Sequence, residues 1–328
     1  MVRTRRFPVA LLLLAAGCAA RTPTESLPPE PPRKPEATSL FGKPLHPPAL
    51  PEESRRDYEA KLAEAREKSE KNREDPDALI WFGRRAAYLG RYQEAIALFS
   101  AGIERFPADP RFYRHRGHRY ITTRQFDLAV ADLEKARALI FSNPDEIEPD
   151  GIPNERNVPT STLQSNVWYH LGLAYYLKGD FESALPAYRD GMKVSTNPDM
   201  LVATSHWLYM TLRRLGEEEE ARRVLEPITE EMDIIENKDY HRLLLMYRGK
   251  LSPESLLSEA AKSGSLANAT VGYGVGNWHL YGGRSEEAVR IFRRILEGEQ
   301  WAAFGYIAAE ADLKRLEDRS SASRRTHS

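Results

Sequence analysis

The sequence predicts an all-α solenoid of about six helix-turn-helix repeats with capping helices, preceded by an export signal and a proline-rich segment. Three observations predict it. Apolar and small residues recur every 34 residues, glycine recurs between the expected helices, and the first 53 residues differ in composition from the rest. A fixed period of this length is typical of helical repeat proteins, in which each helix pair buries its apolar face against its neighbours.

The period is read directly from matching positions. A step of 34 residues carries Gly83 to Gly117 and Phe99 to Leu133, so small residues recur where two helices would touch. The third copy is the clearest, with Trp168-x2-Leu171-Gly172-x2-Tyr175 followed by Ala184-x3-Tyr188. This copy resembles the tetratricopeptide repeat (TPR), whose pattern is W-x2-L-G-x2-Y…A-x3-F. The resemblance implies a TPR-type α-solenoid.

The turns between the two helices of each repeat give a second register. They are expected at Gly90, Arg124, Gly179, Gly216, Gly249 and Gly283, with spacings of 34, 55, 37, 33 and 34 residues. Glycine suits the left-handed conformation that ends a helix, and Arg124 is the departure. The spacing of 55 is one period plus 21 residues, which predicts an insert loop over 141–163.

The expected solenoid covers residues 54–316, followed by a disordered tail over 317–328. A charged helix over 57–72 would precede the first repeat. The run Trp301-x2-Phe304-Gly305 resembles a lone first helix, which suits a cap at the C-terminal end.

The first twenty residues predict export. Three arginines precede the short apolar run 9–16, which is too short to span a bilayer. Cys18 then follows Leu14-Ala15-Ala16-Gly17, which resembles the bacterial lipoprotein signal, although the leucine of that pattern is replaced by Ala15.

The resemblance implies that residues 1–17 are removed and that Cys18 is lipidated as the first mature residue. Because Ala19 rather than aspartate follows, it implies sorting to the outer membrane of a Gram-negative envelope, facing the periplasm. The alternative is an ordinary signal cleaved near Ala20, with Cys18 lost.

Residues 18–53 are expected to form a disordered tether. Ten of the 22 prolines lie within 21–53, and such a density blocks both helices and sheet ladders. The segment 40–50 is more apolar than a solvated tether requires. Whether it docks on the solenoid, and whether the 141–163 insert docks on the groove, are left open.

In TPR proteins the first helix of each repeat lines the concave surface, so the resemblance also implies a partner-binding groove. The register places these residues there: Trp81, Arg84, Tyr88, Arg114, His115, His118, Tyr169, His170, Tyr176, His206, Trp207, Tyr240, Tyr247, Tyr273, Asn277 and Tyr281. Aromatic residues with arginine are concentrated in protein interfaces. We therefore expect a peptide or protein partner, although inner-face aromatics also pack between repeats. The family's clamp for acidic C-terminal peptides does not transfer, because its lysine and asparagine places hold Ile80, Arg84 and His115.

Composition and motifs exclude other functions. With 47 basic and 48 acidic residues, the net charge is −1, which does not favour binding to nucleic acid. A single cysteine excludes an internal disulfide framework. The flanking Arg114, Arg116 and Arg119 would repel a metal ion from His115 and His118. No catalytic motif occurs. We expect a non-enzymatic scaffold without metal or cofactor. The alternatives are a metal- or ligand-binding module on the histidine-rich face and a structural spacer without a specific ligand.

Overall fold

The computed structural model describes residues 34–141 and 144–326, so the predicted export signal and Cys18 lie outside the described residues. The described part contains fourteen helices and one two-stranded hairpin. It forms one compact unit, which we call the body. None of the helices in this described part is both long and apolar enough to cross a membrane.

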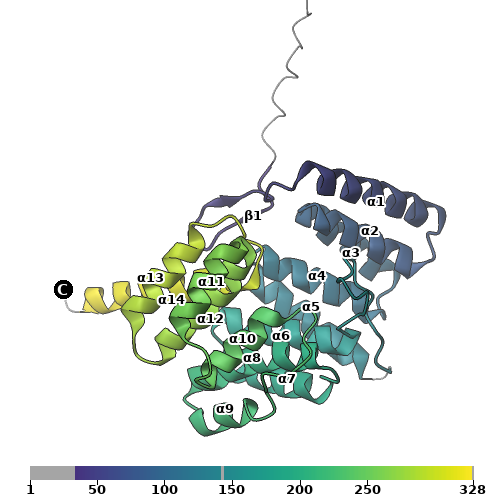
Figure 1. Ribbon diagram of the computed structural model, residues 1–328. Helices are drawn as coiled ribbons and strands as arrows, with labels where there is room; N and C mark the ends of the chain where they lie inside the picture. The colour runs from purple at the N-terminus through teal and green to yellow at the C-terminus, as the bar shows by residue number, and fades with distance from the viewer. Residues whose placement is uncertain (1–33, 142–143, 327–328) are drawn as a thin grey trace, which may run out of the picture. The chain divides into compact units, whose positions relative to one another are not determined.

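Six antiparallel helix pairs follow one another along the chain, as the 34-residue period predicts (Figure 1). The pairs are α2 (Pro76–Tyr88) with α3 (Tyr92–Arg105), α4 (Pro110–Thr122) with α5 (Phe126–Ile140), α6 (Leu163–Lys178) with α7 (Phe181–Lys193), α8 (Pro198–Leu215) with α9 (Glu218–Val224), α10 (Lys238–Tyr247) with α11 (Pro253–Ser263), and α12 (Ser265–Tyr281) with α13 (Ser285–Leu296). The all-α solenoid predicted from the sequence is confirmed.

Local sequence explains where the first helices of the repeats begin. Asp75 and Asp109 each precede a proline, and each side chain accepts a hydrogen bond from the backbone N–H two residues on. Such a cap satisfies one free amide, and proline in the first turn lacks the amide that would be left free. Thr162 starts α6 with a capping box that it forms with Ser165.

The turn register is confirmed at all six positions. Gly90, Gly179, Gly216, Gly249 and Gly283 have φ between 72° and 83°, and Arg124 has φ of 65°. A left-handed conformation costs a residue with a side chain about 1–2 kcal/mol. At this one turn another interaction must therefore offset the strain.

Small residues let the two helices of a repeat approach closely. A Cβ at Gly83 would collide with the ring of Phe99, and one at Gly117 would lie 2.8 Å from Leu133 Cγ. Phe99 and Leu133 are 1% exposed or less. Residues that are 34 positions apart in the sequence therefore make the same contact in successive repeats.

The prediction of a disordered tether over residues 18–53 is wrong for residues 36–46, which fold onto the body. Strand β1 (Ala37–Thr38) pairs with β2 (Pro44–Leu45), and Leu45 is 4% exposed. The backbone N–H of Gln93, at the start of α3, donates to Glu36 Oε2 at 2.8 Å. The apolar composition of the 40–50 segment is explained by this docking.

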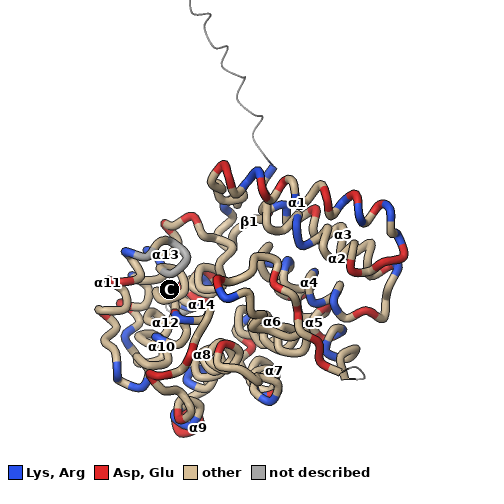
Figure 2. Tube along the Cα trace, turned by 45° about the vertical axis from the view of Figure 1, so that its right-hand side comes forward, with Lys and Arg blue, Asp and Glu red and all other residues tan. Residues whose placement is uncertain are grey.

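Helix α1 (Glu52–Lys71) precedes the first repeat, as the charged segment predicted. Acidic and basic residues alternate along it, as Figure 2 shows. Ion pairs of i,i+4 spacing join Arg56 to Glu52 and Lys61 to Asp57, a pattern typical of a solvated helix. It packs against α2 and extends the solenoid at its N-terminal end.

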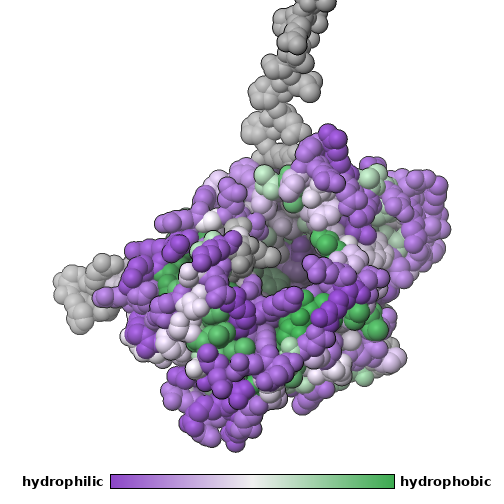
Figure 3. Space-filling view, in the orientation of Figure 1, coloured by the Kyte–Doolittle hydropathy of each residue, from purple (hydrophilic) through white to green (hydrophobic). Residues whose placement is uncertain are grey.

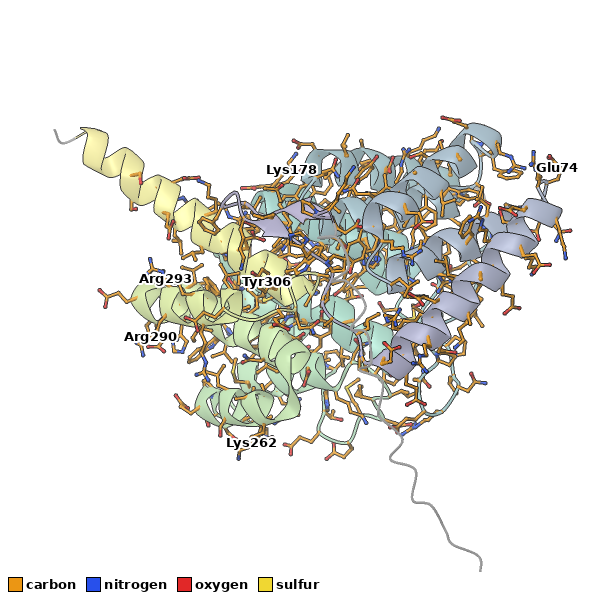
Figure 4. All side chains as sticks on the ribbon, turned by 90° about the horizontal axis from the view of Figure 1, so that it is seen from above. Glu74, Lys178, Lys262, Arg290, Arg293 and Tyr306 are labelled. Atoms are coloured by element: carbon orange, nitrogen blue, oxygen red, sulfur yellow. The ribbon has the colours of Figure 1, made fainter. Side chains whose placement is uncertain are left out.

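Helix α14 (Phe304–Thr326) follows the last pair, and it continues through the segment 317–326 that was predicted as a disordered tail. Its first turns are buried: Tyr306 is 5% exposed and Ile307 is fully buried. Figure 4 places Tyr306 within the body, whereas Arg290 and Arg293 of α13 point away from it. Helix α14 also contacts α6, which precedes it by more than a hundred residues.

The segment around the start of α14 joins the two ends of the solenoid. Arg124 Nε donates to Glu310 Oε2 at 2.8 Å, and Arg124 Nη2 donates to the Trp301 carbonyl at 2.8 Å. The backbone N–H of Leu40, in the hairpin, donates to Glu310 Oε1 at 2.7 Å. This set of bonds, which we call the closure, ties the hairpin and the second repeat to α14. It also provides the interaction that holds Arg124 in its strained conformation.

Candidate partner-binding groove

The inner face of the body carries three adjoining cavities, which together we call the groove. The basic cavity, of about 130 Å³, joins the central cavity, of about 320 Å³, because Arg114 and His118 line both. Tyr240 and Phe304 in turn line both the central cavity and the distal cavity, of about 340 Å³. The space-filling view shows the body hollowed near its centre (Figure 3).

The basic cavity lies between α2, α4 and the insert. Arg114 Nη2 forms an ion pair with Glu148 Oε1 at 2.8 Å, and Arg84 Nη2 donates to the Pro149 carbonyl at 2.7 Å. Both acceptors belong to the insert over 141–163. The sequence did not determine whether this insert docks on the groove. The structure shows that it does dock, at the N-terminal end.

A third arginine lines the basic cavity without a carboxylate. The Arg119 guanidinium lies over the Tyr92 ring at 5.5 Å, and within the described residues its side chain forms no hydrogen bond or ion pair. Burial lowers the pKa of Arg119 to about 10, so the side chain remains charged at neutral pH. The cavity therefore holds a positive charge that no neighbouring acid neutralises.

The histidines beside this cavity are neutral. Burial, followed by the charge of nearby arginines, holds the pKa values of His115, His118 and His170 well below the ordinary value. His170 Nδ1 lies 2.6 Å from the Asn166 carbonyl, which can only accept, so this nitrogen carries the proton. The rings of His118 and His170 stand 4.4 Å apart. Across the described residues, no group of three or more His, Cys, Asp or Glu side chains is placed to hold a metal ion.

Two tyrosines are fixed on the wall of the central cavity. Trp207 Nε1 donates to the Tyr169 hydroxyl at 2.8 Å, and the hydroxyls of Tyr169 and Tyr240 lie 3.0 Å apart. The Tyr240 ring stacks on His206 at 4.6 Å. These contacts hold both rings in place before any partner arrives, which lowers the entropy lost on binding.

The C-terminal half of the inner face is filled by α14. Asp312 is fully buried and bonds Arg214 Nη1 at 2.9 Å and Arg315 Nη2 at 2.7 Å. The Tyr273 hydroxyl donates to Asp312 at 2.9 Å. Burial alone would raise the pKa of Asp312, but Arg214 and Arg315 outweigh it, so the pKa is lowered and the carboxylate stays charged.

The sixteen sequence-predicted groove residues therefore fall into three groups. Nine line cavities: Arg84, Tyr88, Arg114, His115, His118, Tyr169, His170, Tyr240 and Trp81, the last in a small cavity of about 80 Å³ beneath the insert. Five are 1% exposed or less: Tyr176, His206, Trp207, Tyr273 and Asn277. The remaining two, Tyr247 and Tyr281, are partly buried against the core. A partner cannot reach the five buried side chains in this conformation.

Several lining residues were not predicted. Glu148 comes from the insert, Glu236 from the loop before α10, and Phe304 from the start of α14. Arg119 was recognised only as a neighbour that would repel a metal ion. A signal that could have indicated this cavity is that the repeat register brings Arg84, Arg114 and Arg119 together with fewer acidic residues than arginines.

Comparison with known protein families identifies one of the repeats. Residues 165–198, which span α6 and α7, match the tetratricopeptide repeat family. No curated protein matches the chain. The structure of a tetratricopeptide repeat protein from Parabacteroides merdae is similar, with 16% identity over 79% of this chain and 99% of that chain, at a TM-score of 0.43.

YrrB, described as a TPR protein with an unusual peptide-binding site, is similar with 16% identity over 73% of this chain and 95% of that chain, at a TM-score of 0.41. A mutant of MamA is similar with 18% identity over 52% of this chain and 85% of that chain, at a TM-score of 0.38. The chain is thus an all-α solenoid of tetratricopeptide-like helix pairs, with residues 165–198 as the repeat that matches the family itself.

Proposed function

We propose that this protein is a lipid-anchored scaffold of the bacterial cell envelope, which binds a segment of another protein in the groove. The observation that carries the proposal is the continuity of the three cavities on an inner face that α14 fills elsewhere. The three cavities meet around His118 and together offer more room than any one of them alone, which suits a segment of protein chain.

The lining supports a protein ligand. Aromatic rings from Tyr169, Tyr240 and Phe304 provide apolar contact area. Polar side chains between them, including Asn166 and Asn237, can bond a peptide backbone. This mixture of rigid aromatic anchors and dispersed hydrogen-bonding groups is typical of peptide-binding surfaces.

Site-specific photo-crosslinking tests the groove. Phe304 is replaced by p-benzoylphenylalanine in cells, and Leu128, an exposed residue on the outer helix α5, is replaced in a matched control. We expect a discrete crosslinked product from position 304 and none from position 128.

A blocking variant makes the test specific. Ala203 lines the central cavity, so Ala203→Arg should fill it and abolish the product, whereas Ala101→Arg on the exposed side of α3 should not. Equal crosslinking from both photo-reactive positions, or a product that persists in Ala203→Arg, would show that the groove is not the binding surface.

The anchor and the location rest on the sequence before residue 34. The arginines, the apolar run and Cys18 resemble a lipoprotein signal. Metabolic labelling with a fatty acid should mark the wild type and not Cys18→Ser, which should leave the membrane fraction. Replacement of Ala19 by aspartate should move the protein from the outer to the inner membrane fraction. A label retained by Cys18→Ser would remove the anchor from the proposal.

A further inference from the structure

We propose that the basic cavity is a binding site for an oxyanion, a carboxylate or phosphate group, carried by the segment that lies in the groove. The inference rests on the proposed function and names the chemistry by which the partner would be recognised. Its structural basis is a set of three arginines that share one acid and retain unpaired donors.

The first step is the charge of the cavity. Arg84 comes from α2, and Arg114 and Arg119 come from α4, so the two helices bring three guanidinium groups around one space. Glu148 is the acid that lines the space with them, and it pairs with Arg114. Asp150, in the same insert, interacts with the charge of Arg84 through space but lies outside the cavity wall.

The second step is the set of free donors. Arg114 is 7% exposed, and its Nε has no hydrogen-bond partner within the described residues. Burying a polar donor without a partner costs about 1–3 kcal/mol, so native proteins generally satisfy such groups. The partly buried Arg119 side chain makes no hydrogen bond or ion pair in the part of the chain that the structure describes. An oxyanion in the cavity would accept from both arginines.

The third step is size and access. A volume of about 130 Å³ equals the share of about four water molecules, which suits a carboxylate or phosphate with its immediate hydration. Planar guanidinium groups bind these two anions through paired, charge-assisted hydrogen bonds. Arg114 and His118 also line the central cavity, so a group attached to a chain there can enter. Glu148 Oε2 lacks a donor within the described residues, which water entering with the anion would supply.

Isothermal titration of the purified full-length chain in detergent tests the site without the partner. The probes are inorganic phosphate and glutarate, each compared with sodium chloride at the same ionic strength. We expect one or both probes to bind with one site per chain. Binding of phosphate alone would indicate a phosphorylated ligand, and binding of glutarate alone would indicate an acidic residue. Binding of both would indicate a site that recognises negative charge without distinguishing the two groups. Binding of neither would overturn the proposal.

Two variants of opposite sign make the result specific. Arg119→Gln should weaken binding at least about tenfold, the effect of one charge-assisted hydrogen bond of about 1.5 kcal/mol. Glu148→Gln removes the competing negative charge and should strengthen binding at least about fivefold. Arg223→Gln, on the exposed side of α9, is the matched charge control and should bind as the wild type does.

The same affinity in Arg119→Gln and wild type would place the anion elsewhere and overturn the proposal, even if Glu148→Gln failed to fold. The outcome is separable from the proposed function. Photo-crosslinking at position 304 without anion binding would leave a groove that recognises its partner by other contacts. Anion binding without crosslinking would leave the cavity site and remove the protein partner.

Discussion

The two halves of the inner face use buried arginine differently. Where α14 fills the face, Arg124 and Arg214 each bond a carboxylate of α14, and Arg315 of α14 itself shares Asp312 with Arg214. In the open half, Arg114 bonds Glu148, while Arg84 bonds a carbonyl and Arg119 bonds no acid among the described residues. Paired arginines hold the chain's own helix in place, and unpaired ones mark a surface that is still available.

Helix geometry explains why α14 can bond to side chains on both sides of it. Glu310 and Asp312 are two residues apart, so they project from nearly opposite sides of a helix. One reaches the turn after α4 and the other reaches α8 and α12. Both are 1% exposed or less, because protein surrounds this part of α14. The following predictions test whether the filled half is structural and the open half is functional.

The largest effect is expected at Asp312. Asp312→Asn leaves Arg214 and Arg315 facing a buried neutral amide, and removing one partner of a buried ion pair costs about 3–5 kcal/mol. Urea denaturation should show this loss in the free energy of unfolding. Asp318→Asn, in the exposed part of the same helix, should stay within about 0.5 kcal/mol of wild type. An equal, small loss in both variants would refute a structural role for the filled half.

A smaller loss is expected at the closure. Arg124→Gly relieves about 1–2 kcal/mol of backbone strain but breaks a buried pair worth about 3–5 kcal/mol. The net expectation is a loss of about 1–4 kcal/mol, from those two ranges. The comparison variant is Arg91→Gly, which removes an exposed arginine beside the preceding turn. A gain in stability for Arg124→Gly would show that the closure does not offset the strain.

Acid should destabilise the body through its buried histidines. Burial lowers the pKa of His206 to about 3, and His115, His118 and His170 are shifted in the same direction. Below about pH 6.5 the unfolded chain takes up protons that the folded chain refuses, so stability falls as the pH falls.

Each such histidine contributes up to about 1.4 kcal/mol per pH unit between about pH 6.5 and its folded pKa. Denaturation at pH 7 and pH 5 measures the slope, and His206→Phe should reduce it. A slope that is unchanged in His206→Phe would mean that this histidine is protonated in the folded protein.

The smallest effect on stability is expected at Arg119. Because it has no acid partner in the described structure, Arg119→Gln should change the free energy of unfolding by less than about 0.5 kcal/mol, or raise it slightly. Thermal denaturation without ligand measures this difference. A loss comparable to that of Asp312→Asn would show that the open half is as structural as the filled half.

Local signals explain what the sequence could predict. The turn glycines, the small residues opposite Phe99 and Leu133, and the Asp-Pro starts of the helices act within a few residues or one repeat. These interactions determine the helix pairs and which helices line the inner face.

Long-range packing explains what could not be predicted. Glu310 and Asp312 look like ordinary surface acids in the sequence, and only the curvature of the solenoid brings Arg124 and Arg214 to them. Tyr273 is 1% exposed and donates to Asp312 of α14, and the buried ring of Trp207 stacks on Tyr273. The sequence predicted a capping helix from the run at Trp301, Phe304 and Gly305, but not that its buried acids would dock it on the inner face.

The closure also changes how this solenoid should come apart. Open repeat arrays fray from their ends, because a terminal repeat has only one neighbour. Here the hairpin before the first repeat and Arg124 of the second repeat both bond Glu310, which belongs to α14 at the other end of the chain. We expect amide protons in α2 and α12 to exchange with solvent at similar, slow rates, as in a ring that opens in one event. Breaking the bond at Arg124 should restore a gradient of exchange along the chain.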